Sequence, residues 1–260
     1  MTLIGWSSMG EKQEVVGLEK RGDVAVVTLL RSSRRNSMNQ DLVDGVRAAL
    51  IELDRDDSIG AIVLVGAPPG FSAGSDLKFI GALGLEAMGR FEQECGDLGR
   101  LIGFISKPVV AAVEAFAIGG GFTFATCCDV VVAGRGSKWS LPEVPHGWLT
   151  PWGIKSLVAR VGLVKARLLC FCLEPLTAEA ARELGVVDYC CDDGEALSTA
   201  VSIAEKLAML PRPAVAATKR FFSGYLMENA EAMDFEANRL FLDNCQERAA
   251  QATLDKFRHR

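Results

Sequence analysis

Two glycine-bearing stretches are the strongest chemical signals in the sequence. They read FSAGSDLK (Phe71–Lys78) and AIGGGFT (Ala117–Thr123), and each lies between an apolar run and a helical pattern. Glycine lets a ligand approach the backbone closely, and the start of a helix leaves amide N–H groups without partners. If the two loops face each other, their amides can hold one oxyanion that develops during a reaction. Ordinary tight turns remain the alternative on these residues alone.

Sequence patterns for several other ligands are absent. The chain has neither the G-x-G-x-x-G spacing of a dinucleotide site nor the Gly-Lys-Ser/Thr ending of a phosphate-binding loop. None of the eight cysteines forms a C-x-x-C pair, and only two histidines are present, so we expect no metal site. We also expect no separate cofactor, and we expect the thiols to be reduced and mostly buried.

The composition argues against two classes of partner. Lys and Arg number 28 against 33 Asp and Glu, which gives a net charge of -5. A nucleic-acid-binding protein needs a basic field instead. No apolar run approaches the roughly 20 residues that cross a bilayer, and residues Met1 to Glu14 lack the pattern of a signal peptide. We therefore expect a soluble cytoplasmic protein that binds neither nucleic acid nor a membrane.

Alternating strand and helix patterns can position the first glycine loop. Val24–Leu30 (VAVVTLL) and Ala61–Val65 (AIVLV) are β-rich apolar runs, and Asn39 can cap a helix between them. The first glycine loop follows the second of these strands. A strand, a helix, a strand and a glycine-bearing loop predict an α/β fold with a site at the carboxyl end of the strand.

The second glycine loop has a similar setting. A helical pattern over Met88–Phe104 and a strand over Val109–Val113 precede it, and a further helix begins at its glycines. Beyond about residue 200 the pattern is purely helical. We therefore predict an α/β core over residues 1–199 and a helical region over residues 200–260 that serves oligomerisation.

A series of motifs identifies a family. The chain contains, in this order, RNSMN, FSAGSDLK, KPVVAAVEAFAIGGG, CDVVVA, SLPEVPHG and AARELGVVD. The series is similar in order and spacing to that of the crotonase (enoyl-CoA hydratase/isomerase) family, and the resemblance extends from about Val16 to Arg258. It implies a spiral of ββα units followed by a C-terminal helical region, and assembly into homotrimers that often pair as homohexamers. It also implies an acyl-CoA substrate, of which coenzyme A is a part.

The resemblance implies roles for the loop residues. The amides of Ser75 and Gly120 would form an oxyanion hole for the thioester oxygen, with Gly119 beside the substrate. Lys256, on the terminal helix, would reach the coenzyme phosphate bound by a neighbouring subunit. A solvated surface charge is an equal alternative for Lys256 and for Arg35. The residues expected to line the coenzyme A groove are Arg35, Asn36, Ala73, Asp76 and Leu77.

Two positions bear on the expected reaction. Hydratases of this family usually carry two glutamates, one just after the triple glycine and one in the Pro-Glu motif. Here the first position is Thr123, which has no useful basicity near neutral pH, and the second is Glu143. We therefore expect isomerisation of a 3-enoyl-CoA to a 2-enoyl-CoA by a single base. Glu143 would remove the α-proton and return it to the γ-carbon, helped by an apolar pocket that raises its pKa.

Other interpretations of the same residues stay open. Thr123 or His146 could position a water molecule for hydration or dehydration. Decarboxylases and hydrolases of the family need only enolate stabilisation and a local acid, and a non-catalytic acyl-CoA-binding member is a further alternative. A lone histidine such as His146 is more often structural or solvent-facing, and the alternative is a second acid–base group or a contact to a polar acyl chain. Trp152, with Trp148, could shape the acyl pocket or simply pack in the core.

Overall fold

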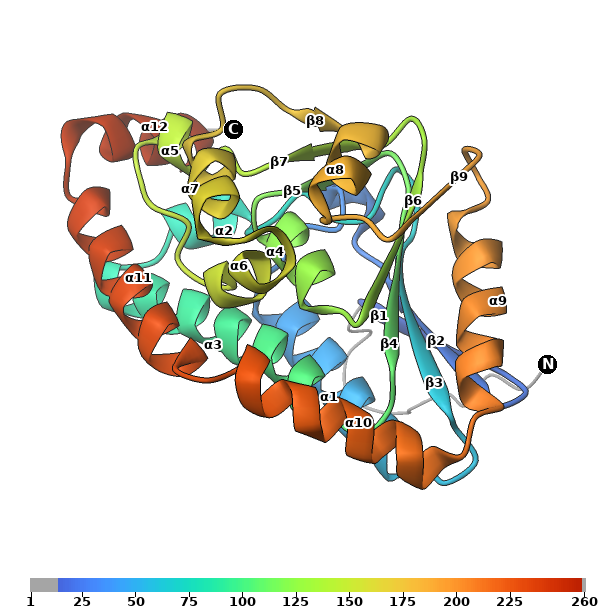
Figure 1. Ribbon diagram of the computed structural model, residues 1–260. Helices are drawn as coiled ribbons and strands as arrows, with labels where there is room; N and C mark the ends of the chain where they lie inside the picture. Colours follow the sequence, from blue (N-terminus) through green and yellow to red (C-terminus); the bar gives the residue numbers. More distant parts are fainter. Residues whose placement is uncertain (1–13, 259–260) are drawn as a thin grey trace.

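Residues 14–258 are described by a computed structural model, and a large sheet runs through their centre (Figure 1). Its strand order is β1-β2-β3-β4-β6-β9, with β1 and β2 antiparallel and the other neighbours parallel. The strands are β1 (Val16–Arg21), β2 (Val24–Leu29), β3 (Ala61–Gly66), β4 (Val109–Val113), β6 (Val130–Gly134) and β9 (Tyr189–Cys191).

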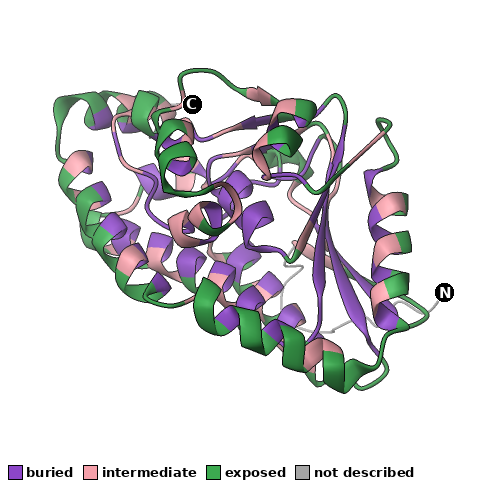
Figure 2. Cartoon of the chain, in the orientation of Figure 1, coloured by how far each residue is buried: buried purple, intermediate pink, exposed green. Residues whose placement is uncertain are grey.

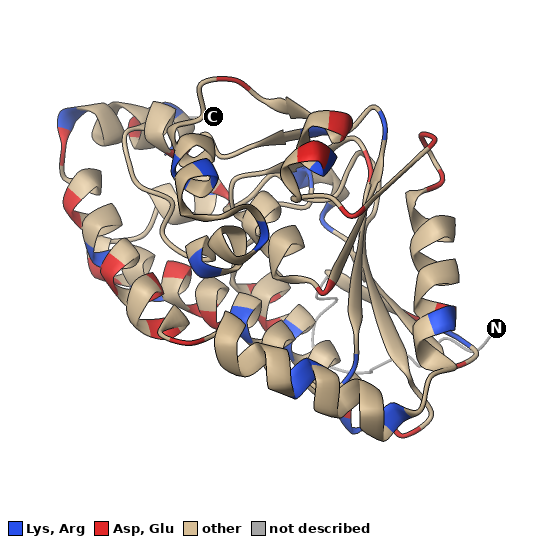
Figure 3. Cartoon of the chain, in the orientation of Figure 1, with Lys and Arg blue, Asp and Glu red and all other residues tan. Residues whose placement is uncertain are grey.

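The central strands are apolar throughout because both faces of the sheet are covered, as is usual for parallel sheets (Figure 2). On one face, Val63 and Val65 of β3 pack against helix α9 (Ala196–Ala208). On the other face, Ile62 and Leu64 enter the larger core beneath the remaining helices. Charged side chains lie mainly on the helices and loops around the sheet (Figure 3).

A second, smaller sheet lies beside the carboxyl ends of the large one. It has the order β5-β7-β8, formed by β5 (Phe116–Ile118), β7 (Lys138–Ser140) and β8 (Leu176–Thr177). Strand β4 leads directly into β5 and then into α4, and β6 leads into β7 and then into α5. Each of these two turns therefore contributes one strand to each sheet and then a helix. This repetition confirms the expected α/β spiral of ββα units.

The helices begin and end where their sequences predict in several cases. The side chain of Asn39 accepts a hydrogen bond from the Leu42 amide at 3.2 Å, which confirms it as the cap of α1. The helices are α1 (Gln40–Arg55), α2 (Leu77–Gly81), α3 (Leu85–Phe104), α4 (Gly120–Cys127), α5 (Glu143–His146), α6 (Ile154–Val161), α7 (Leu163–Phe171), α8 (Ala178–Leu184), α9, α10 (Arg212–Leu226), α11 (Ala230–Cys245) and α12 (Arg248–Arg258).

The C-terminal helices enclose the site from the side opposite α9. Helix α11 packs along α3, and α12 packs against α2 and α5. A Cβ atom added to Gly147, just after α5, would lie 2.6 Å from the Ala250 amide nitrogen, so α12 touches the end of α5. The expected boundary between residues 199 and 200 falls inside α9, which packs on the sheet. The division into two regions stays a prediction.

Four sequence expectations concern the chain as a whole. No helix within residues 14–258 is long and apolar enough to cross a membrane. All eight cysteines are free thiols, and most are buried, as predicted. Among the described residues, no group of three or more His, Cys, Asp or Glu side chains is arranged to hold a metal ion. The N-terminal stretch in which we expect no signal peptide lies, apart from Glu14, outside the described residues.

Candidate active site

Backbone pairing brings the two glycine loops together. Met38 bridges to Ser75, and Ser72 bridges to Ala117, so the first loop is held between two neighbouring segments. Gly74 has φ +82°, and a Cβ atom at that position would lie 2.8 Å from the Gly120 nitrogen. Only glycine permits both this conformation and this close approach. The loops therefore face each other, as the sequence predicts.

The amides of Ser75 and Gly120 lie beside each other with their donors available. A Cβ atom added to Gly120 would lie 3.5 Å from the Ser75 nitrogen. The bridge to Met38 uses the Gly74 carbonyl and the Asp76 amide, so it leaves the Ser75 amide unused. Neither amide donates a hydrogen bond to another protein atom within the described residues. Gly120 also begins α4, where the helix carries partial positive charge. This pair can hold one oxyanion.

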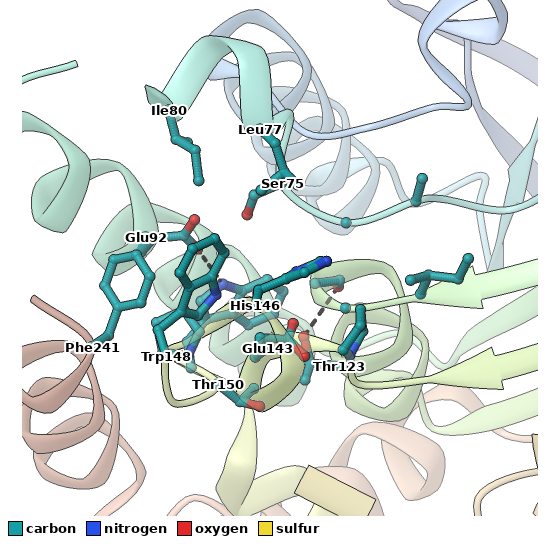
Figure 4. A pocket seen from close by; sticks show the side chains of 18 residues that line it. Ser75, Leu77, Ile80, Glu92, Thr123, Glu143, His146, Trp148, Thr150 and Phe241 are labelled. Atoms are coloured by element: carbon teal, nitrogen blue, oxygen red, sulfur yellow. Dashed lines mark hydrogen bonds between the residues drawn. The ribbon is translucent and has the colours of Figure 1, made fainter. Parts of the chain in front are cut away.

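A small pocket of about 70 Å³ opens onto these amides (Figure 4). It brings together Ser75, Gly120 and Glu143, the three residues expected to act on the thioester. Six further residues that were expected to contact substrate also line it: Ala73, Leu77, Gly119, Thr123, His146 and Trp152.

Glu143 has a carboxyl group that is short of partners. It is the first residue of α5, and its side chain is only 7% exposed. A Cβ atom on Gly119 would lie 2.9 Å from its Oε1, so the carboxyl lies next to the triple glycine. Its Oε2 is buried without a hydrogen-bond partner among the described residues. Burial raises the pKa of Glu143 to about 8; its own amide opposes this rise and the charge of Glu92 adds to it. In its ionised form, which predominates above about pH 8, such a group is a stronger base than an ordinary carboxylate.

The Thr123 hydroxyl is bonded within its own helix and is not free to take part in the chemistry of the Glu143 carboxyl. It is fully buried, and its hydroxyl donates to the Gly120 carbonyl at 3.1 Å, within its own helix. A Cβ atom on Gly153 would lie 2.8 Å from the Thr123 Cβ, so the other side of Thr123 is closely packed. The hydroxyl is therefore already engaged where a second glutamate would hold water.

His146 and the two tryptophans form apolar walls. The His146 ring lies 5.4 Å from Trp148 and 6.5 Å from Phe257, centroid to centroid. Burial, and then the positive charge of Lys256, lower the pKa of His146, so it is neutral near pH 7. Trp148 also packs edge-on against Phe241 at 6.0 Å. Aromatic rings from α5, α11 and α12 therefore line one side of the pocket or support it.

One residue of the pocket, Glu92, was not predicted from the sequence. It lies on α3, is 2% exposed, and its Oε2 accepts a hydrogen bond from Trp152 Nε1 at 2.9 Å. Burial raises the pKa of Glu92 to about 7, although the Ser75 hydroxyl and the Trp152 indole act in the opposite direction. A signal was present, since Glu92 follows the buried Met88 by four residues and so falls on the apolar face of its helix.

Two of the residues expected in the coenzyme A groove have side chains that bond within the protein. The Asn36 side chain is fully buried, where it donates to the carbonyls of Ala67 and Gly70. Asp76 caps α2 and forms an ion pair of 3.0 Å with Arg31. Both side chains therefore help to hold the loop, and the amides of both residues are bonded within it as well.

Arg35 and Lys256, the two basic residues expected to contact coenzyme A, do not line the pocket but lie near it. Arg35 is exposed, its guanidinium stacks 4.5 Å from the Phe116 ring centroid, and its carbonyl accepts from the Ala73 amide at 3.0 Å. Lys256 is exposed on α12, close enough to His146 to lower its pKa. Both charges therefore lie at the rim of the pocket within one chain.

Comparison with known proteins agrees with this geometry. A family model described as enoyl-CoA hydratase/isomerase matches residues 19–260. A short-chain-enoyl-CoA hydratase from Clostridium acetobutylicum is 30% identical over 92% of this chain and 94% of its own length.

Solved structures share the fold. An enoyl-CoA hydratase/isomerase from Mycobacterium paratuberculosis superposes with a TM-score of 0.86, at 24% identity, over 95% of this chain and all of its own. A monofunctional enoyl-CoA isomerase from M. smegmatis superposes with a TM-score of 0.70, at 27% identity, over 82% of this chain and 93% of its own. With the two facing glycine loops and the order of the spiral, these matches show that the chain belongs to the enoyl-CoA hydratase/isomerase family.

Proposed function

We propose that the protein converts a 3-enoyl-CoA thioester to the 2-enoyl-CoA, with Glu143 as the base that removes the α-proton. The observation that carries this proposal is the buried, unpartnered Oε2 of Glu143 beside the two free amides. Loss of the α-proton places negative charge on the thioester oxygen. Donors that are already oriented toward that oxygen stabilise the resulting dienolate more than they stabilise the substrate.

The surroundings of Thr123 favour isomerisation over hydration. Addition of water by two carboxylates needs a second acid–base group beside the triple glycine, and the Thr123 hydroxyl is bonded to its own helix. Isomerisation needs no bound water, and the pocket is small and has apolar walls. The likeness to the M. smegmatis protein named as a monofunctional enoyl-CoA isomerase gives further support.

The coenzyme A portion would lie across the rim of the pocket. We propose that Arg35 and Lys256 attract its phosphates, since both are exposed cations beside residues that contact the pocket. Lys256 lies near His146 of its own chain. Whether it serves its own site or that of a neighbouring subunit depends on an assembly that stays a prediction.

Replacement of Glu143 by Gln tests the proposed base. The variant keeps the size of the side chain but cannot accept the α-proton, so turnover of 3-enoyl-CoA should fall by about 10²- to 10⁴-fold. Binding of a saturated acyl-CoA, measured by calorimetry, should persist. Glu94→Gln, on the outer part of α3, serves as a matched control and should retain activity. A Glu143→Gln enzyme with wild-type turnover would remove the proposal.

Hydration is the second candidate, because the Clostridium acetobutylicum relative is named a short-chain-enoyl-CoA hydratase. If the protein is a hydratase, the absorbance of crotonyl-CoA should fall when enzyme is added. No fall, together with turnover of 3-enoyl-CoA, would exclude this alternative.

A further inference from the structure

The pocket contains a second carboxyl group, on Glu92, that the proposed function does not use. Glu92 comes from α3, on a different element from Glu143, and its side chain is almost fully buried. In Figure 4 the carboxyls of Glu92 and Glu143 stand apart, with Trp148 between them in this view. The two carboxyls therefore line different parts of the same pocket.

The local structure does not require a carboxyl at this position. The Ser75 hydroxyl and the Trp152 indole are the donors to Glu92, and a glutamine oxygen would accept such hydrogen bonds equally well. No Lys, Arg or His forms an ion pair with Glu92 among the described residues, although buried carboxyls are normally paired. An unpaired ionisable group that lines a pocket is a frequent sign of a function in catalysis.

Trp152 determines the position of the Glu92 carboxyl relative to the proposed oxyanion hole. A Cβ atom on Gly120 would lie 3.1 Å from Cζ2 of Trp152, so one edge of the indole touches the proposed oxyanion hole. The Nε1 of the same ring holds Glu92 at 2.9 Å. Glu143, by contrast, lies against Gly119. An acyl group whose carbonyl oxygen meets the Ser75 and Gly120 amides would therefore have one carboxyl near its first carbons and the other farther along the pocket.

We propose that Glu92 is a second catalytic residue, a general acid that delivers a proton to the γ-carbon while Glu143 removes the α-proton. This inference rests on the proposed isomerase function and changes its second half. From the sequence, one carboxyl is expected to perform both transfers, whereas two carboxyls at different positions divide them.

The steps balance in atoms and charge. The Glu143 carboxylate takes the α-proton, and the C–H electron pair forms the dienolate, whose negative charge rests on the thioester oxygen. The dienolate then re-forms its carbonyl, the double bond moves to the 2-position, and the γ-carbon takes the proton of the Glu92 carboxyl. Glu143 is left protonated and Glu92 ionised. After the product leaves, both groups exchange protons with water and regain their starting states.

Isotope labelling separates this route from a single-carboxyl shuttle. With unlabelled 3-enoyl-CoA in deuterated water, mass spectrometry and NMR should find deuterium at the γ-carbon of the product from the first turnover. The complementary measurement uses substrate deuterated at the α-carbon in ordinary water. There the γ-carbon should contain hydrogen, because its proton comes from Glu92. Transfer of the α-deuterium to the γ-carbon would overturn the inference.

Variants at position 92 provide a second test of the inference. Glu92→Gln keeps the acceptor for Trp152 but has no acidic proton. Isomerisation should fall by about 10²-fold or more, while exchange of the α-protons of the bound substrate with deuterated water continues. Glu92→Asp should recover part of the rate, and the control Glu94→Gln should resemble the wild type. Circular dichroism and acyl-CoA binding establish that the variants are folded.

The outcomes distinguish this inference from the function on which it rests. If Glu92→Gln isomerises at the wild-type rate, Glu92 is no catalytic residue and the isomerase proposal stands. If Glu92→Gln loses isomerisation and α-exchange together, Glu92 does not act specifically at the γ-carbon. If the wild type itself turns over no 3-enoyl-CoA, the proposed function fails and this inference fails with it. The labelling of the wild type remains decisive even if Glu92→Gln does not fold.

Discussion

Two carboxyl groups in one dry pocket are difficult to ionise together. Burial raises the pKa of Glu92 to about 7 and that of Glu143 to about 8, and the charge of Glu92 contributes to the latter. Near neutral pH the pair therefore holds about one proton in common. The proposed acid–base pair acts from the singly protonated form in which Glu143 is the carboxylate and Glu92 the carboxylic acid. Because the pKa of Glu92 is the lower of the two, this is the less populated of the two singly protonated forms.

We expect a bell-shaped dependence of kcat/KM on pH for 3-enoyl-CoA, with its maximum between about pH 7 and about pH 8. At lower pH both groups are protonated and no base remains. At higher pH both are ionised and no acid remains. Initial rates from about pH 5.5 to about pH 9.5 would measure this profile. In Glu92→Gln the alkaline limb should vanish and leave a rise to a plateau, and an unchanged bell in that variant would contradict the assignment.

The histidine and the cysteines around the two carboxyls are neutral in this pH range. The pKa of His146 on α5 is lowered by burial and then by Lys256, so it carries little charge near pH 7. Four cysteines interact electrostatically with Glu92 or Glu143, and burial raises the thiol pKa of each. They are Cys95, Cys170, Cys172 and Cys245. The pH profile should therefore report the two carboxyls.

The contrast between Glu143 and Glu92 shows which site residues a sequence can reveal. Glu143 lies in a motif whose order and spacing are specific, so the motif alone predicts its role. Glu92 lies in an amphipathic helix, where one glutamate among many has no distinctive spacing. Only the packing of α3 against Trp152 decides that its carboxyl enters the pocket. For Asn36 and Asp76 the structure adds a role that the motif does not reveal, because their side chains also hold the loop.

At the scale of elements, one buried aspartate joins three parts that support the pocket. Asp234 on α11 forms an ion pair with Arg100 on α3, and it accepts a hydrogen bond from the Gly153 amide at 2.9 Å. Gly153 follows Trp152 directly, so this aspartate positions the ring that contacts Glu92. Burial raises the pKa of Asp234, although Arg100 opposes the rise.

Replacement of Asp234 by Ala should lower the free energy of unfolding by about 3 kcal/mol, because it removes the buried partner of the Arg100 guanidinium and leaves the Gly153 amide without an acceptor. Asp97 provides the control, since it pairs with the same Arg100 but is half exposed. Asp97→Ala should cost less than about 1 kcal/mol. Urea denaturation monitored by circular dichroism measures both. Equal effects of the two substitutions would contradict this account.

Long elements could be predicted from the sequence, and short ones could not. The periodicity of α3 and the β-rich runs of β3 and β4 are long enough to identify their elements. Strand β5 has only three residues and is stabilised by its pairing with β7, far along the chain. No local pattern encodes such pairing, and the short helix α5 is likewise defined by its tertiary setting.

At the scale of the whole molecule, an apolar patch lies exposed on α10. Phe221, Phe222 and Tyr225 are 61%, 56% and 66% exposed. The Phe221 ring packs 5.4 Å from each of the other two. We call these three residues the α10 patch. Clustered exposed aromatic rings are typical of protein–protein interfaces. The patch lies in the region that the sequence predicts to serve oligomerisation.

We expect the wild-type protein to sediment as a trimer of about 84 kDa, three times the 27.9 kDa chain, or as a hexamer.

The double substitution Phe221→Ser and Tyr225→Ser should shift the protein toward monomers, because it removes apolar area from the α10 patch. Leu18→Ser, at an exposed apolar position of β1, is the control and should leave the mass unchanged. Analytical ultracentrifugation measures the mass of the wild type and of both variants. A monomeric wild type would contradict the predicted assembly, and an unchanged mass in the double variant would exclude the α10 patch as its interface.

The indole of Trp152 touches the proposed oxyanion hole with one edge and donates to Glu92 from its nitrogen. A ring without an N–H at position 152 would leave the carboxyl buried with one donor fewer, and an apolar residue at position 92 would leave the indole N–H with no acceptor. Each of these substitutions alone should therefore lower stability, which links the two positions. Among relatives that diverged from this chain, glutamate at position 92 and tryptophan at position 152 should be inherited or lost together.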